Sequence, residues 1–140
     1  MIQLVGFDLD GTLVDSVEDV GDAVNAGLKS VGLPLRSRED YLSYMGTDLN
    51  DFVQMAMNPV EDDQIREQIK IEFEQYYHNH CCDKSKLFPG IRTLCNTLQQ
   101  QGKLLFVLSN KQTEFVVQIL NKLLPEISFI KILGDCEEYP

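Results

Sequence analysis

Short apolar runs and longer amphipathic runs alternate along the chain, and the two patterns predict different elements. Residues 2–7 form a short apolar run that ends at Asp8, and residues 103–108 form a second one that ends at Ser109. A third apolar run covers residues 127–133. Short apolar runs with polar residues at the carboxyl end are typical of buried parallel strands that lead into a polar site.

Helical periodicity fills the segments between these strands. Amphipathic runs at residues 91–98 and 115–123 separate the later strands, and this order predicts a parallel α/β sheet. A longer block, residues 17–84, contains only helical patterns. Ser16, with Asp19 three residues on, is the expected cap of its first helix.

The helical block interrupts the α/β pattern between the first strand and the second. We therefore predict an α/β fold with a Rossmann-like parallel sheet core and an inserted helical cap. The core would comprise residues 1–15 and 88–140, and the cap would comprise residues 16–87.

Composition narrows the classes of function. The chain has 140 residues, of which 44% are hydrophobic, and a formal net charge of −10. This charge disfavours binding to nucleic acid or to an anionic membrane, because nucleic-acid binding needs clustered Lys and Arg. No apolar run approaches the roughly 20 residues of a membrane span. Four cysteines without a C-x-x-C spacing are expected to be reduced thiols of a cytoplasmic protein.

Asp8 and Asp10 follow the first strand, at the carboxyl end where open α/β sheets bind ligands. One carboxylate can attack phosphorus and form an acyl-phosphate, while the other protonates the leaving oxygen and later activates water. Two close carboxylates also suit a hard cation such as Mg²⁺. The backbone N–H groups of Gly11 and Thr12 are candidates to hold phosphate oxygens. The simpler alternative is that Asp-x-Asp-Gly only marks a turn.

Three motifs together resemble those of a known family. The sequence D-L-D-G-T-L-V-D-S at residues 8–16 resembles the first motif of the haloacid dehalogenase superfamily. Ser109-Asn110-Lys111 resembles the second motif, and Phe88-Pro89-Gly90 resembles the segment by which the family's chain leaves its cap. A helical insertion directly after the first motif is similar to the phosphoglycolate phosphatase-like group. The resemblance spans essentially the whole chain.

This resemblance implies roles for individual residues. Asp8 would be the nucleophile and a Mg²⁺ ligand, and Asp10 would be the general acid/base whose backbone carbonyl also binds Mg²⁺. Ser109 would hydrogen-bond the transferring phosphoryl group, and the backbone at Leu9, Asp10 and Asn110 would help to hold it. The implied reaction is the Mg²⁺-dependent hydrolysis of a small phosphorylated metabolite through an aspartyl-phosphate. The acid at Asp10 argues against a true dehalogenase.

Two further parts of the family's site are not evident in the sequence. One is a lysine that neutralises charge, for which Lys111 and Lys131 are the nearby candidates, although Lys131 lies in a strand pattern that points it away. The other is a G-D-x-x-x-D motif that completes the Mg²⁺ site. Gly134-Asp135 resembles its start, but too few elements separate it from Ser109, so Asp135 is disfavoured as a metal ligand.

The chain therefore looks shortened at its carboxyl end. An incomplete sheet is expected to expose an apolar edge or face and to self-associate. Two alternatives to a phosphatase remain open, a sugar-phosphate mutase with the same core and a non-catalytic fragment or degenerate paralogue. Net release of phosphate would separate the hydrolase from both.

Overall fold

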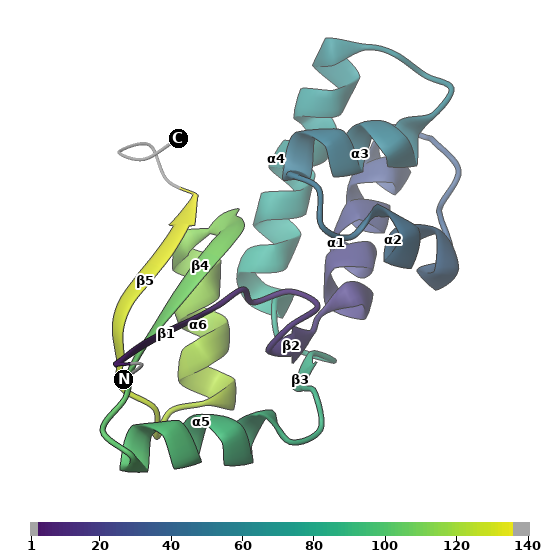
Figure 1. Ribbon diagram of the computed structural model, residues 1–140. Helices are drawn as coiled ribbons and strands as arrows, with labels where there is room; N and C mark the ends of the chain where they lie inside the picture. The colour runs from purple at the N-terminus through teal and green to yellow at the C-terminus, as the bar shows by residue number, and fades with distance from the viewer. Residues whose placement is uncertain (1–2, 136–140) are drawn as a thin grey trace. The chain divides into compact units, whose positions relative to one another are not determined.

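A three-stranded parallel sheet forms the centre of the α/β part of the protein. The structure, a computed structural model, describes residues 3–135. Strands β1 (Leu4–Phe7), β4 (Leu104–Gln112) and β5 (Phe129–Asp135) lie side by side in the order β1-β4-β5 (Figure 1). Both strand pairs are parallel. The predicted α/β fold with a parallel sheet is thus confirmed.

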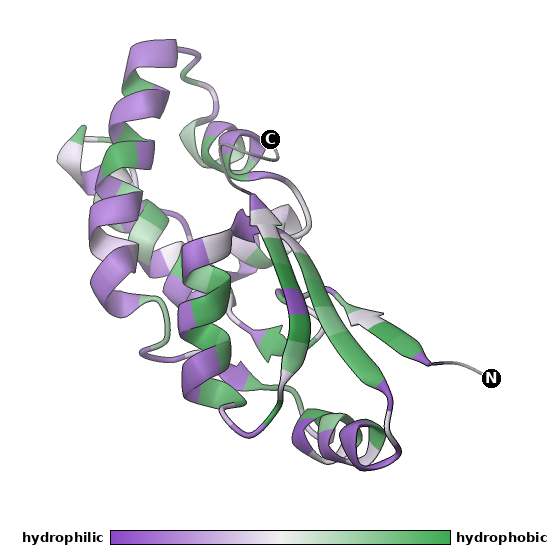
Figure 2. Ribbon diagram, turned by 90° about the vertical axis from the view of Figure 1, so that its left-hand side faces the viewer, coloured by the Kyte–Doolittle hydropathy of each residue, from purple (hydrophilic) through white to green (hydrophobic). Residues whose placement is uncertain are grey.

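Helices α5 (Ile91–Gln100) and α6 (Thr113–Leu123) pack against this sheet. Alternate residues of a strand point to opposite faces, and in β4 the buried residues are Leu105 and Val107. The strands are hydrophobic along most of their length and more hydrophilic towards their ends, as Figure 2 shows. One face of the sheet therefore belongs to the core.

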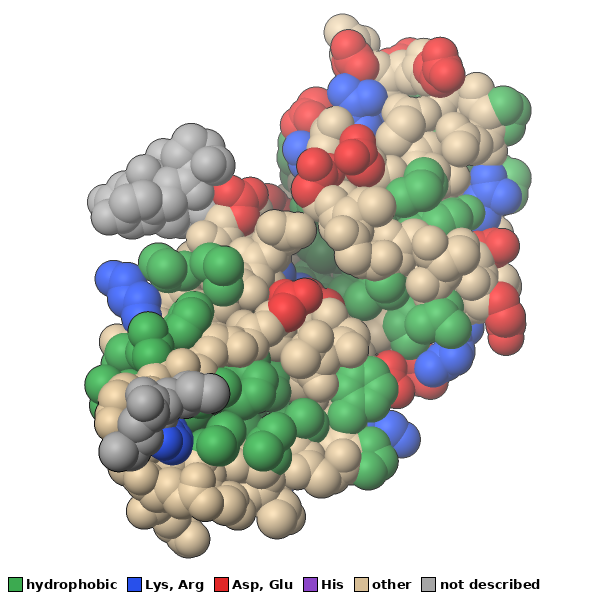
Figure 3. Space-filling model, viewed as in Figure 1, with side chains coloured by type: hydrophobic (Ala, Val, Ile, Leu, Met, Phe, Trp, Pro, Cys, Tyr) green, Lys and Arg blue, Asp and Glu red, His purple; other side chains and the backbone are tan. Residues whose placement is uncertain are grey.

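The opposite face of the sheet stays open in the described part of the chain. Leu4, Leu104, Leu108 and Ile130 are each about half exposed, at 52%, 49%, 58% and 53%. Hydrophobic side chains gather over these strands in the space-filling view (Figure 3). The prediction of buried strands is therefore wrong for this face, whereas the expected exposure of an apolar face is observed within residues 3–135. Within residues 3–135, β1 pairs only with β4.

Two short strands lie where the chain passes between the core and the helical block. Strand β2 (Val14–Asp15) pairs antiparallel with β3 (Lys86–Leu87). Because of this pairing, the helical unit is Ser16–Ser85 and not residues 16–87, and Lys86 and Leu87 belong with the core. Two-residue strands are too short to leave a periodic pattern, so the sequence did not predict them.

The helical unit contains α1 (Val17–Ser30), α2 (Arg38–Tyr44), α3 (Leu49–Met57) and α4 (Asp63–His80). Its all-helical character is as predicted, but the short helix α2 was not expected. Side chains capping α2, α3 and α4 come from Ser37, Asp48 and Asp62 respectively, each of which accepts a backbone N–H of the first turn.

Helix α1 begins directly after Ser16, as predicted, but the expected capping bond is not formed. Ser16 makes no side-chain cap hydrogen bond, and the Asp19 carboxylate instead accepts bonds from the backbone N–H groups of Lys84 and Ser85. Local spacing cannot reveal a partner so far along the sequence.

The cysteines and the possibility of a membrane span were the two remaining expectations. Cys81, Cys82 and Cys95 are buried and form no disulfide with one another, whereas Cys136 lies outside the described residues. Burial raises the pKa of the Cys95 thiol. Among the described helices, none is both long and apolar enough to cross a membrane.

Candidate active site

The turn after β1 carries the two aspartates of the first motif. Strand β1 ends at Phe7, and Asp8 is exposed directly after it. Leu9 is fully buried, whereas the Asp10 side chain is 21% exposed. Because Leu9 fixes the loop to the core, the aspartates on either side of it are presented at the carboxyl end of the strand.

Gly11 allows this loop to fold back on itself. Its φ angle of 80° lies in the left-handed region, which favours glycine. The carbonyl of Leu9 accepts the N–H groups of Thr12, Leu13 and Val14 at 3.2, 2.9 and 3.0 Å. The motif is thus a compact turn as well as a set of reactive groups.

This turn changes the predicted mode of phosphate binding. The N–H of Gly11 donates to the carbonyl of Val14 at 2.9 Å, and that of Thr12 donates to the carbonyl of Leu9. Both N–H groups are used inside the turn, so the expectation that Gly11 and Thr12 offer them to phosphate does not fit this geometry. The N–H of Leu9 likewise donates to Asp8 Oδ1 at 2.8 Å. That bond orients the Asp8 carboxylate, and Leu9 would have to release it to hold a phosphoryl oxygen.

The second motif lies at the end of β4, inside the strand and not after it as predicted. The β4–β5 register shifts between Leu108 and Gln112, so the segment between them is irregular. The N–H of Lys111 donates to Ser109 Oγ at 3.1 Å. A hydroxyl that accepts a bond keeps its own hydrogen for donation, so Ser109 retains the chemistry predicted for it. Asn110 is exposed in the same segment.

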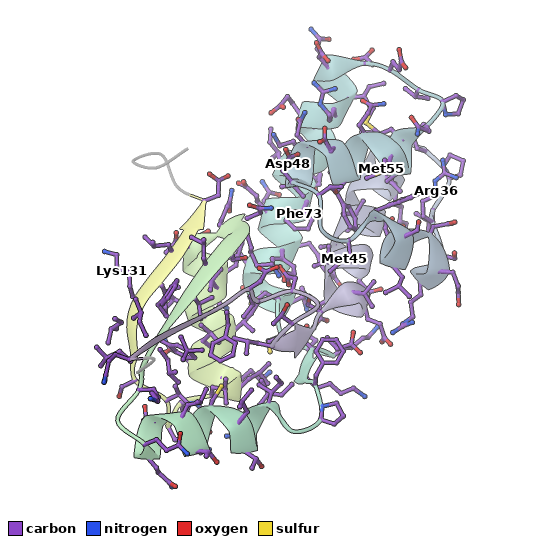
Figure 4. All side chains as sticks on the ribbon, viewed as in Figure 1. Arg36, Met45, Asp48, Met55, Phe73 and Lys131 are labelled. Atoms are coloured by element: carbon purple, nitrogen blue, oxygen red, sulfur yellow. The ribbon has the colours of Figure 1, made fainter. Side chains whose placement is uncertain are left out.

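Lys111 was a candidate for the charge-neutralising lysine, but the sequence did not predict its contact with Asp10. Its Nζ lies 2.8 Å from Asp10 Oδ1, and its side chain is only 8% exposed. Lys131, the other lysine considered, is exposed on β5 and extends outward from the strand (Figure 4). The sequence signal for a role of Lys111 in the site was its position directly after Ser109-Asn110, at the edge of the sheet where β1 also ends.

Asp135 ends β5, where it is exposed and paired in register with Gln112. Within residues 3–135, no group of three His, Cys, Asp or Glu side chains is arranged to hold a metal ion. The oxygens at Asp8 and Asp10 are nevertheless of the hard type that Mg²⁺ prefers, and Mg²⁺ is commonly held through one or two carboxylates plus water and substrate phosphate. The donor chemistry of the turn therefore fits Mg²⁺ without Asp135.

Comparison with known proteins gives consistent matches. The model of the haloacid dehalogenase-like hydrolase family matches residues 5–138. The phosphoglycolate phosphatase of Mannheimia succiniciproducens is 32% identical over 139 residues, which are 94% of this chain and 62% of the relative. The crystal structure of a predicted phosphoglycolate phosphatase from Haemophilus somnus is 31% identical, with a TM-score of 0.87 over 95% of this chain and 62% of that chain. That of a predicted phosphatase from Clostridium acetobutylicum is 26% identical, with a TM-score of 0.84.

The chain spans 62% of the length of the Mannheimia relative, and the same share of the two crystal structures. The matched range includes the turn at Asp8 and Asp10 and the segment around Lys111. The activity, substrate and partners of this protein are therefore proposals.

Proposed function

Because this chain belongs to the haloacid dehalogenase-like hydrolase family, we propose that it carries the nucleophile and the general acid/base of a Mg²⁺-dependent phosphomonoester hydrolase. The observation that supports the proposal most is the turn that presents Asp8 and Asp10 on either side of the buried Leu9. The phosphoglycolate phosphatases among its relatives favour a small phosphorylated metabolite, and phosphoglycolate first, as substrate.

In the first half of the reaction, a carboxylate oxygen of Asp8 attacks the phosphorus atom. The bond from phosphorus to the leaving oxygen breaks, and Asp10 gives that oxygen a proton. In the second half, Asp10 takes a proton from water, and the water oxygen attacks the phosphorus of the aspartyl-phosphate. Inorganic phosphate leaves and Asp8 is regenerated. The hydrogen bond from the Leu9 N–H orients Asp8 for this role.

Mg²⁺ would be held by the Asp8 carboxylate and the Asp10 backbone carbonyl. When bound, it supplies positive charge that offsets the negative charge of the phosphoryl group. Ser109 Oγ, the N–H of Asn110 and the Thr12 hydroxyl are the protein groups we propose as phosphoryl contacts. The N–H groups of Gly11 and Thr12 are not among these contacts, because they donate to carbonyl groups within the turn.

The test is release of inorganic phosphate from phosphoglycolate in the presence of Mg²⁺. We expect Asp8→Asn to lower the rate by roughly a thousandfold or more, because the amide is a poor nucleophile. The matched control is Asp15→Asn, a carboxamide change in β2 that should keep most of the wild-type rate.

Each other outcome has a distinct meaning. Equal rates for Asp8→Asn and the wild type would remove the nucleophile assignment. Phosphate binding without turnover by the wild type would favour the non-catalytic alternative, and interconversion of sugar phosphates without net release would favour the mutase.

A further inference from the structure

The ion pair between Lys111 and Asp10 is largely withdrawn from water. The Lys111 side chain is 8% exposed and that of Asp10 is 21% exposed, and 2.8 Å separates Nζ from Oδ1. Lysine is rarely buried to this extent unless it is paired, because removing an ammonium group from water is costly. A pair in this setting is screened less than a surface salt bridge and constrains both side chains more strongly.

The backbone that carries Lys111 is fixed from two sides. Its N–H donates to Ser109 Oγ at 3.1 Å. On the side of β5, a Cβ atom at Gly134 would lie 2.5 Å from the Lys111 carbonyl oxygen, so only glycine permits this close approach. The N–H of Gly134 also donates to Thr113 Oγ1 at 3.1 Å. Gly134 of β5 therefore has a structural role, because its close approach supports the end of β4 that carries Lys111.

From these contacts we infer that Lys111 is a positioning residue for the general acid/base Asp10, an assignment that rests on the proposed function. Lys111 donates to Oδ1 of Asp10, so the contact fixes the orientation of the Asp10 carboxyl group. In the proposed reaction, the Asp10 carboxyl group gives its proton to the leaving oxygen as the bond from phosphorus to that oxygen breaks, and Asp10 becomes a carboxylate. Lys111 holds this carboxyl group in one orientation through the step, and a correctly placed acid transfers its proton more readily.

This role predicts a dependence on the leaving group. The leaving group of phosphoglycolate is the alkoxide of glycolate, which needs the proton of Asp10. The leaving group of 4-nitrophenyl phosphate is a stabilised phenolate, which needs a proton from Asp10 much less. Comparing kcat/KM isolates the first half of the reaction, because this constant reports the steps up to the first irreversible one.

The experiment compares Lys111→Met with Lys131→Met in the full chain. In Lys111→Met we expect kcat/KM to fall about 10- to 100-fold for phosphoglycolate, a part of the usual contribution of general acid catalysis, and to fall much less for 4-nitrophenyl phosphate. Lys111→Arg should recover part of the loss, since it restores a cationic donor. Lys131→Met, which removes an exposed lysine from the next strand, should leave both values near those of the wild type. Equal losses for the two esters in Lys111→Met, or no loss, would overturn the inference.

A second measurement does not depend on turnover. Reductive methylation of lysines, followed by mass spectrometry, should modify Lys111 much more slowly than Lys131, and Asp10→Asn should raise the rate at Lys111 selectively. If Lys111 reacts as fast as Lys131, or if Asp10→Asn has no effect, the pairing inference fails. Absence of phosphate release from the wild type, with the labelling pattern intact, would instead count against the proposed function alone.

Discussion

At the scale of single residues, Asp19 shows how one buried carboxylate joins distant parts of the chain. It is 2% exposed and accepts the backbone N–H of Lys84 at 2.9 Å and both the N–H and the hydroxyl of Ser85 at 2.6 Å. These partners lie 65 and 66 residues further along the sequence. The bonds satisfy a carboxylate that would otherwise be costly to bury, and they fix the end of the helical unit to the first turn of α1.

Replacing Asp19 with Ala should therefore destabilise the unit Ser16–Ser85. The substitution leaves buried donors unsatisfied, and we expect the free energy of unfolding to fall by about 2–3 kcal/mol, measured by urea denaturation. The control is Asp22→Ala, which removes the partner of the exposed Lys84 ammonium 2.7 Å away and should hardly move the unfolding midpoint. Similar midpoints for the two variants would show that the Asp19 bonds do not hold this end of the unit.

The sequence predicted those features of the site that depend on local patterns, but not those that depend on contacts between residues far apart in the chain. Asp8 and Asp10 belong to a contiguous motif after an apolar strand, so their place at the strand end followed from the pattern. The contact between Asp10 and Lys111 joins residues 101 positions apart and depends on the pairing of β1 with β4. The internal use of the Gly11 N–H depends on the path of the turn, which residue types alone do not specify.

At the scale of elements, the long amphipathic helices and the three sheet strands were predictable because each spans several repeats of its period. Helix α2 has seven residues, and β2 and β3 have two each, so tertiary contacts decide them. One such contact set surrounds Asn25. Its side chain accepts the Arg36 N–H at 3.0 Å, donates to the Arg36 carbonyl at 3.1 Å, and accepts the hydroxyl of Tyr41. Helices α1 and α2 are thereby joined through the loop between them.

Tyr41 gives this junction a predicted dependence on pH. Burial, the largest cause, raises the pKa of its phenol above the usual value of about 10. The unfolded chain therefore loses the phenolic proton first, so this contribution to stability is present below about pH 10 and declines as the pH rises further. In Tyr41→Phe we expect a free energy of unfolding about 1 kcal/mol lower at neutral pH and a smaller alkaline loss.

Urea denaturation at neutral and at alkaline pH measures both effects. The matched control is Tyr76→Phe, which removes a hydroxyl from a partly exposed ring that stacks on His80 in α4. Identical alkaline losses in Tyr41→Phe and the wild type would contradict the account of this junction.

At the scale of the whole molecule, the open face of the sheet is the main departure from a fully buried α/β core. Its exposed side chains include Leu4, Leu104 and Ile130. The sequence predicted self-association from an incomplete sheet, and that expectation stays a prediction, for which this face is the proposed location. Contiguous exposed apolar surface on a sheet commonly marks association or aggregation.

Sedimentation velocity over a range of concentrations tests this location. The weight-average sedimentation coefficient of the wild type should rise with concentration. Leu104→Glu should shift this coefficient towards that of the monomer, because a charge on the open face opposes the burial of that face. The matched control is Ile71→Glu, a charge at a 49% exposed position of α4, which should behave like the wild type. A wild type that stays monomeric throughout would contradict the prediction.

Nucleophilic attack by Asp8 would form a covalent aspartyl-phosphate, and trapping this intermediate tests the proposed reaction. The chain is mixed with phosphoglycolate and Mg²⁺, quenched in acid and treated with borohydride, which reduces an aspartyl-phosphate to homoserine. Peptide mass spectrometry should then find homoserine at position 8, only when substrate was present, and not in Asp8→Asn. Release of phosphate with an unmodified Asp8, or reduction at a different carboxylate, would contradict the account.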